Sequence, residues 1–297
     1  KEKGYILWPL NFEVEGEIIE CEGISSTRIS RDYRLRLPPA IREIAPRAFD
    51  IFGDIAIIKL SDLSIEHSKI ISEALLESHT NINKVALDHG VKGDYRIRDL
   101  EMLIGDSNFV ATQKENGFQF KLDISKVYFS PRLAMERKRI YDIAISNEDV
   151  LDAFAGASPF AVSLSSKGCN VTAVDANPNS EKWSHENFGL NNVLDYNFIC
   201  SKIEDILPSL SLYDRIIMNN PTNALPYLEM LSKKLKSNGI IHLYNILEDE
   251  EDFKVEDYLG PNFKCTFEKI VHPYSSHSSL MVYDIVKSVS TVQKTNQ

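Results

Sequence analysis

From residue 147 onward, short apolar runs alternate with longer segments of mixed polarity. This alternation predicts β-strands separated by helices, and therefore a parallel sheet covered by helices on both faces. A helix stop at Asn238-Gly239 marks the end of one such segment. The strands are expected at 150–154, 170–175, 196–200, 214–218 and 240–246, and the helices at 159–167, 179–190 and 224–236.

The last part of the chain follows a different pattern. An acidic helix is expected around 248–258, and two strands at 263–271 and 280–286 flank a turn rich in Ser, His and Pro. Strands that lie so close in sequence are expected to pair antiparallel. The predicted fold class is therefore α/β, with a doubly wound sheet that ends in a C-terminal antiparallel hairpin.

The first half mixes alternating strand patterns with one helical segment, and this predicts a smaller α+β domain. The domain is expected over residues 36–130, and the doubly wound domain over 131–297. The strand patterns lie at 6–10, 33–37, 55–60, 84–86 and 118–122, and the helical pattern at 64–78.

Composition places the 297-residue chain among globular proteins, with 43% hydrophobic and 26% charged residues. No apolar run reaches about 18 residues and no secretion leader is visible, so a cytoplasmic protein without a membrane span is expected. The four cysteines form no C-x-x-C pair, and no metal site is expected.

The net charge of −10 is distributed unevenly along the chain. Residues 1–140 carry 21 basic and 22 acidic side chains, whereas residues 141–297 carry 12 and 21. Contacts with nucleic acid are therefore expected in the first half, although a solvated surface of balanced charge explains the same pattern.

Candidate chemistry begins where the strand at 150–154 runs into the small-residue turn Ala155-Gly156-Ala157. A backbone without bulky side chains can approach a ligand there, and Asp175 at the end of the next strand can accept both ribose hydroxyls. A dinucleotide site would need G-x-G-x-x-G, but Ser158 and Ala161 occupy the second and third glycine positions. The pattern therefore favours S-adenosylmethionine.

The segment Val127-Tyr-Phe-Ser-Pro-Arg-Leu-Ala-Met-Glu-Arg137 resembles the Y-F-x-P-R-L-x-x-E junction of the archaeal and eukaryotic tRNA methyltransferases that modify nitrogen 1 of guanine 37. The similarity extends to residues 93–105, to Lys114-Glu-Asn-Gly117 and to Met218-Asn-Asn-Pro221. The resemblance implies an S-adenosylmethionine-dependent enzyme, expected as a monomer, that acts on tRNA with a purine at position 37. Residues 1–35 resemble a remnant of the family's N-terminal tRNA-binding domain.

The resemblance also implies catalytic roles that suit the chemistry. Nitrogen 1 of guanine holds a proton at neutral pH, so methylation needs a base, and positive charge must stabilise the oxygen 6 that becomes more negative. Glu136 would act as the base and Arg96 as the positive group, with Arg132 beside them. Another interpretation is that Glu136 forms a helical ion pair with Arg132, because the two are four residues apart.

The expected cofactor site gathers residues from the turn, the strand ends and the segment before the helix. An acid of the family that faces the adenine amino group aligns with Lys202, which leaves Glu204 or Asp205 as substitutes. The cofactor residues implied by the resemblance are Tyr128, Arg137, Asp152, Phe154, Ala155, Gly156, Asp175, Ala176, Lys202, Ile203, Asn219 and Pro221.

The loop Asn219-Asn-Pro-Thr222 helps to choose between related activities. Enzymes that methylate exocyclic amines use N-P-P-aromatic, but Thr222 and Asn223 replace the second proline and the aromatic ring. A sister family that transfers the aminocarboxypropyl group lacks the M-N-x-P loop and the arginine after S-P, both present here. Methyl transfer to guanine is therefore preferred. The alternatives are aminocarboxypropyl transfer or methylation of 4-demethylwyosine in the wyosine pathway, and tRNA binding without catalysis.

Overall fold

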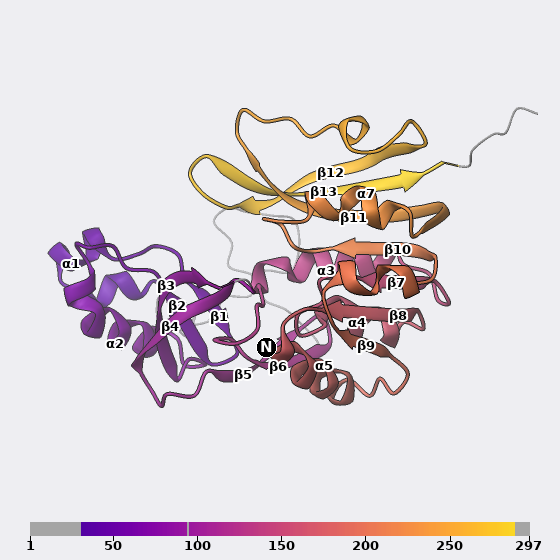
Figure 1. The fold of residues 1–297 in the computed structure, drawn as a ribbon. Helices are drawn as coiled ribbons and strands as arrows, with labels where there is room; N and C mark the ends of the chain where they lie inside the picture. The colour runs from indigo at the N-terminus through magenta and orange to yellow at the C-terminus, as the bar shows by residue number, and fades with distance from the viewer. Residues whose placement is uncertain (1–30, 94, 289–297) are drawn as a thin grey trace, which may run out of the picture.

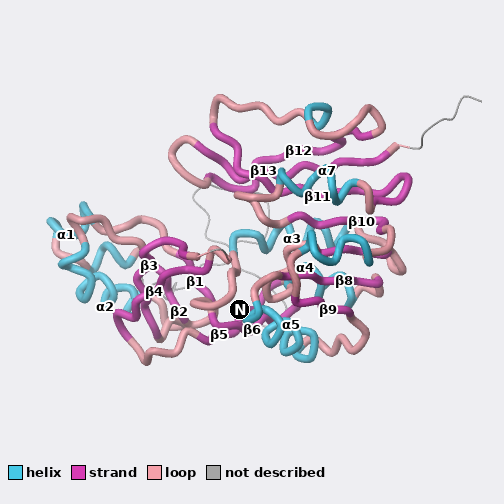
Figure 2. The backbone as a smooth tube through the Cα atoms, viewed as in Figure 1, coloured by secondary structure: helices cyan, strands magenta, loops and turns pink. Residues whose placement is uncertain are grey.

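A computed structural model describes residues 31–93 and 95–288. The predicted strand at 6–10 and most of the predicted N-terminal remnant lie outside the described residues. Figure 1 shows a smaller lobe, which holds the indigo and purple elements, beside a larger lobe built around one long sheet. Figure 2 shows the same arrangement with helices and strands separated by colour.

The larger lobe contains a seven-stranded sheet of order β12-β13-β11-β10-β7-β8-β9. Neighbours from β9 to β11 pair in parallel, whereas β13 pairs antiparallel with both β11 and β12. The predicted α/β class and the C-terminal hairpin are confirmed. The strands are β7 (Asp149–Asp152), β8 (Asn170–Asp175), β9 (Asn197–Cys200), β10 (Tyr213–Met218), β11 (Leu235–Glu248), β12 (Phe263–Pro273) and β13 (Ser278–Lys287).

Alternate side chains of the central strands enter two different cores, which shows that helices cover both faces of this sheet. Val150 and Ile217 pack in the core that includes α4 and α5, whereas Leu151 and Ile216 pack in the core that includes α7. Two buried faces explain why these strands are almost continuously apolar. The helices are α3 (Ala134–Ile143), α4 (Pro159–Ser166), α5 (Pro178–Leu190), α6 (Ile203–Ile206) and α7 (Leu225–Ser232).

The smaller lobe holds a four-stranded sheet of order β1-β2-β3-β4 with two helices. Its α+β character agrees with the sequence pattern. A separate hairpin, β5 (Val110–Glu115) and β6 (Phe118–Asp123), lies between the lobes (Figure 1). The remaining elements are α1 (Pro39–Ile44), α2 (Ser68–Ser78), β1 (Asp50–Phe52), β2 (Ile55–Ile58), β3 (Lys84–Lys92) and β4 (Ile97–Ile104).

Two asparagine side chains, one on α5 and one directly after it, attach this hairpin to the larger lobe. Asn191 accepts a hydrogen bond from the Gln119 amide at 2.9 Å and donates one to the Gln119 carbonyl at 2.7 Å. Asn187 accepts from the Lys121 amide at 2.7 Å and also donates to the Ala157 carbonyl at 2.9 Å. The hairpin and the turn at 155–158 are therefore held by the same buried asparagine.

Three expectations are wrong. The helix expected at 224–236 ends at Ser232, and Asn238-Gly239 lies inside β11 rather than at a helix stop. The segment at 33–37 is a 3-10 helix, Tyr33–Arg36, rather than a strand, because Asp32 caps it by accepting a hydrogen bond from the Arg34 amide. The acidic helix around 248–258 is reduced to one turn, Val255–Asp257. Strand β11 instead continues to Glu248, where it still pairs with β13.

Candidate active site

The turn after β7 is held in a fixed shape by β8. The Ala155 amide donates to the Val174 carbonyl at 2.8 Å, and the Gly156 amide donates to Asp175 Oδ2 at 2.7 Å. Gly156 has a φ of +54°, and an added Cβ would lie 3.3 Å from the Tyr128 carbonyl. The glycine is therefore required both by its backbone conformation and by the close approach of the Tyr128 segment.

Asp175 organises the end of β8. Its Oδ1 accepts hydrogen bonds from the Asn177 amide at 2.9 Å and from the Ser180 hydroxyl at 2.9 Å. Burial raises the pKa of Asp175, while the amides of Asn177 and Gly156 oppose that rise. The carboxylate lies next to the turn, as the sequence predicted, and its remaining lone pairs can accept further hydrogen bonds.

Two buried polar groups near these strand ends have no hydrogen-bond partner among the described residues. Asp152, at the end of β7, is 1% exposed, and neither of its carboxylate oxygens is paired. Asn219, directly after β10, has an unpaired buried Oδ1. Buried acceptors without donors are costly, so both positions suit a ligand that presents N–H or O–H groups. The amino group and ribose hydroxyls of S-adenosylmethionine are donors of this kind.

The lack of partners changes the proton affinity of Asp152. Burial, and secondarily the charge of Asp175, raises its pKa from 3.8 to about 7. The amides of Phe154 and Ala161 oppose this shift, although neither forms a hydrogen bond of normal geometry.

The other predicted cofactor residues surround the same strand ends. Pro221 accepts a hydrogen bond from the Ile246 amide at 3.1 Å, which ties the loop after β10 to β11. Lys202 is exposed at the start of α6, and Ile203 behind it is buried. Phe154 packs edge-on against Tyr227 with ring centroids 5.4 Å apart, and Ala155 is buried, whereas Ala176 is partly exposed. Their contacts with a cofactor stay predictions.

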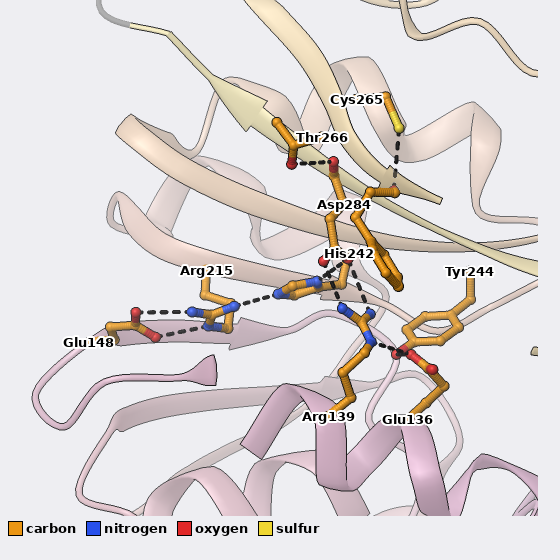
Figure 3. Close-up of polar contacts among 10 residues, drawn as sticks. Glu136, Arg139, Glu148, Arg215, His242, Tyr244, Cys265, Thr266 and Asp284 are labelled. Carbon is orange, nitrogen blue, oxygen red and sulfur yellow. Dashed lines mark hydrogen bonds and ion pairs between the residues drawn. The ribbon is translucent and has the colours of Figure 1, made fainter. Parts of the chain in front are cut away.

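Glu136 lies on α3 with only 2% of its surface exposed. Its Oε2 accepts hydrogen bonds from Arg139 Nε at 2.8 Å and from the Tyr244 hydroxyl at 3.4 Å. Its Oε1 has Lys269 Nζ at 3.7 Å. Figure 3 shows Glu136, Arg139 and Tyr244 pointing toward one another from α3 and the neighbouring sheet.

The interpretation of Glu136 as an ion-pair partner of Arg132 is wrong. Arg132 lies in a 3-10 turn, Pro131–Leu133, before α3 begins, so the four-residue spacing is not maintained by one regular helix. Its Nε instead donates to Asp50 Oδ1 at 2.9 Å, across to the smaller lobe. The role of Arg132 in catalysis stays a prediction.

Arg137 is already engaged with the protein. Its buried guanidinium makes two hydrogen bonds to Glu115 and a third to the Ser130 carbonyl, and it lies 4.7 Å from the centre of the Phe129 ring. These contacts connect α3 to the β5–β6 hairpin. Any contact of Arg137 with the cofactor stays a prediction.

Arg96 occupies the turn between β3 and β4 with a φ of +50°. Its Nη2 donates to the Tyr274 hydroxyl at 3.4 Å, and Tyr274 belongs to the turn between β12 and β13. Tyr274 is 52% exposed and Tyr128 is 41% exposed. The loop of the smaller lobe therefore meets the turn of the C-terminal hairpin at an accessible surface.

Several polar residues of this region were missed by sequence reasoning. Arg139 and Tyr244 contact Glu136, and Asp284 and His242 continue the contacts through Arg139 (Figure 3). Lys269 lies on the other oxygen of Glu136. One signal was available, because His242 and Asp284 interrupt the apolar runs at 240–244 and 280–286. Buried polar residues within such strands usually have specific partners.

Across residues 31–93 and 95–288, no group of three or more His, Cys, Asp or Glu side chains is placed to hold a metal ion. Over the same ranges, no helix is both long and apolar enough to cross a membrane.

Two family models match the chain. Residues 111–266 match the TRM5/TYW2 methyltransferase domain, and residues 34–108 match the TYW2 N-terminal domain. The chain is 37% identical over 255 residues to the tRNA (guanine(37)-N(1))-methyltransferase Trm5b of Pyrococcus abyssi, an alignment that covers 82% of this chain and 74% of the relative. It is 33% identical over 201 residues to the tRNA (guanine(37)-N(1))-methyltransferase of Trichomonas vaginalis, covering 66% of this chain and 53% of that protein.

Solved structures agree with the sequence matches. The crystal structure of Trm5b from Pyrococcus abyssi has a TM-score of 0.80 at 32% identity, and covers 95% of this chain and 88% of that one. A complex of aTrm5 with tRNALeu has a TM-score of 0.77 at 29% identity, and the match covers 94% of this chain and 84% of that one.

Proposed function

Because the chain belongs to the TRM5/TYW2 methyltransferase family, we propose that it methylates nitrogen 1 of guanine at position 37 of tRNA. S-adenosylmethionine would supply the methyl group. The relatives named for this activity, and the relative solved with tRNALeu, support the substrate. A cytoplasmic location, a monomeric state and a purine requirement at position 37 stay predictions.

The observation that carries the proposal is the buried carboxylate of Glu136, whose Oε1 accepts no hydrogen bond from the described residues, connected through Tyr244 to a site suited to a nucleoside. Tyr244 connects the two regions, because its hydroxyl reaches Glu136 and its ring lies 5.8 Å from the ring of Phe160 in α4. The helix α4 begins at Pro159, directly after the turn held by Asp175. A general base and a nucleoside-binding site on connected elements suit the transfer of a methyl group to a ring nitrogen of a nucleobase.

Asp175 and Asn219 would hold the cofactor, with Asp152 behind them as a further acceptor. Glu136 would take the proton from nitrogen 1, which leaves the nitrogen lone pair free to attack. Arg96 would donate to oxygen 6, where negative charge increases as the proton leaves. The contact of Arg96 with Tyr274 supports this role, because it holds the guanidinium against the C-terminal hairpin, whose strand β12 carries Lys269 beside Glu136.

The test uses unmodified tRNA with guanine at position 37 and S-adenosylmethionine labelled in either the methyl or the carboxyl group. We expect only the methyl label in the RNA, and 1-methylguanosine after nuclease digestion. The control tRNA has adenine at position 37 and should remain unlabelled.

Two outcomes would contradict the proposal. Carboxyl label in the RNA would show aminocarboxypropyl transfer, and this outcome matters because residues 34–108 match the TYW2 N-terminal domain. Binding of tRNA without any label would show a protein that binds but does not catalyse.

A further inference from the structure

The two oxygens of Glu136 have different surroundings. Oε2 accepts from Arg139 Nε and from the Tyr244 hydroxyl, whereas Oε1 accepts no hydrogen bond from the described residues and has Lys269 Nζ at 3.7 Å, on a side chain that is 53% exposed. We propose that Arg139 is a positioning residue, which fixes Glu136 so that Oε1 is the atom that accepts the proton. This inference rests on the proposed function and assigns a residue and an atom to its base.

Arg139 suits this task because its guanidinium is held at both ends. While Nε donates to Glu136, Nη1 and Nη2 donate to the two oxygens of Asp284 at 2.7 Å and 3.2 Å. The guanidinium carbon also lies 4.6 Å from the centre of the Phe267 ring. A planar fork with three directed hydrogen bonds restricts rotation of the side chain, which a lysine ammonium cannot do.

Asp284 is held from the opposite side by His242. The imidazole Nδ1 donates to Asp284 Oδ1 at 2.6 Å, and Nε2 accepts from Arg215 Nη1 at 2.5 Å (Figure 3). An arginine cannot accept a hydrogen bond, so this geometry assigns the neutral tautomer with the proton on Nδ1. Arg215 in turn pairs with Glu148 at 2.8 Å and 3.0 Å. The chain of contacts runs from α3 through β13, β11 and β10 to the residue before β7.

The electrostatics agree with fixed charges along this chain. Burial lowers the pKa of His242, which keeps the ring neutral between two arginines. Burial alone would raise the pKa of Asp284, but the hydrogen bond from His242 and the charge of Arg139 lower it. For Arg139, hydrogen bonds with Asp284 and Glu136 outweigh burial and raise the pKa of the guanidinium. Arg139 therefore stays charged and Asp284 stays ionised.

A carboxylate that is almost fully buried needs a cationic partner, but a partner on both oxygens would block its use as a base. The arrangement around Glu136 meets both requirements. Arg139 and Tyr244 share one oxygen, and the other faces a flexible lysine that an incoming nucleobase can displace. The groups that face Glu136 are Arg139 on α3, Tyr244 on β11 and Lys269 on β12, with Asp284 on β13 behind Arg139.

The test is Arg139→Lys in the full chain, assayed in single turnover with saturating tRNA and S-adenosylmethionine. Lysine keeps the positive charge, but one ammonium cannot reproduce the three directed bonds. We expect the rate to fall roughly 10–100-fold through misplacement of the base, with both dissociation constants within about threefold of wild type. Lys138→Gln is the matched control, because Lys138 is the preceding residue of α3 and pairs only with exposed Asp142 among the described residues.

A second variant, Arg139→Gln, gives a readout that a purely structural role would not change. Loss of a cationic donor disfavours the ionised carboxylate, so the acid limb of the pH–rate profile should move up by about one pH unit. If circular dichroism shows that either Arg139 variant is unfolded, Asp284→Asn is used instead. This substitution weakens the hydrogen bonds that Arg139 Nη1 and Nη2 donate, and it should lower the rate in the same way.

The results separate the two proposals. An active wild type whose Arg139 variants match Lys138→Gln in rate and pH profile would overturn the positioning role alone. A wild type that transfers no methyl group to tRNA would overturn the proposed function and the positioning role with it.

Discussion

Asp152 offers a direct test of the electrostatics at the end of β7. The side chain is buried, lacks partners, and has its pKa raised from 3.8 to about 7 by burial and by Asp175. The substitution Asp152→Asn keeps the shape and removes the proton equilibrium. We expect the free energy of unfolding of the ligand-free variant, relative to wild type, to be higher at pH 8 than at pH 5.

The sign follows from proton binding. Between pH 4 and pH 7 the folded state retains a proton on Asp152 that the unfolded state has released, so wild-type stability falls as the pH rises through this window and is constant above it. A rise from 3.8 to about 7 corresponds to at most about 4 kcal/mol at 1.36 kcal/mol per pH unit. About 3 kcal/mol of this falls between pH 5 and pH 8.

Urea unfolding at pH 5 and pH 8 measures the effect. The free energy of unfolding of the variant minus that of wild type is determined at each pH, and the value at pH 5 is subtracted from the value at pH 8. Asp149→Asn is the control on the same strand. Hydrogen bonds from Lys236 and Asn170 lower the pKa of Asp149, so it is ionised at both pH values and its removal should change stability equally at each. If Asp152→Asn and wild type showed the same pH dependence, Asp152 would be ionised in the folded protein and the reasoning would be wrong.

Three further substitutions test the site. Asp175→Ala should weaken S-adenosylmethionine binding by roughly 2–4 kcal/mol in calorimetry, and unchanged affinity in a folded variant would remove Asp175 from the site. Glu136→Gln should lower single-turnover methyl transfer about 10²–10⁴-fold while tRNA and cofactor still bind, and a wild-type rate would leave Glu136 with a structural role only. Arg96→Ala should lower the same rate with tRNA binding largely kept, and a pure loss of tRNA affinity would contradict its expected role at oxygen 6.

The sequence predicted the parts of the fold that depend on local pattern. Strand β8 has the expected bounds, because an apolar run between polar ends identifies a strand buried on both faces. The end of β11 was not predictable in this way. Residues up to Glu248 remain in the strand because they pair with β13, some thirty residues later in the chain, and this pairing overrides the local acidic pattern.

The sequence predicted which residues of the candidate site meet only where they follow neighbouring strands of the sheet. Gly156 and Asp175 lie next to each other as the turn and strand pattern indicated. Arg139 is only three positions from Glu136 on the same helix, but the other partners could not be found in this way. Tyr244 is 108 positions from Glu136, and Asp284, which holds Arg139, is 145 positions from that arginine. One sequence carries no information on which distant polar residues meet in a core.

The turn before α4 couples two buried serines, Ser158 and Ser184. Ser158 has a φ of +63°, a conformation that favours glycine. Its hydroxyl is fully buried and lies 2.5 Å from the hydroxyl of Ser184 on α5. A glycine at position 158 would relax the backbone but remove the partner of Ser184. We therefore expect the two sites to covary, with a small apolar residue at position 184 in homologues that have glycine at position 158.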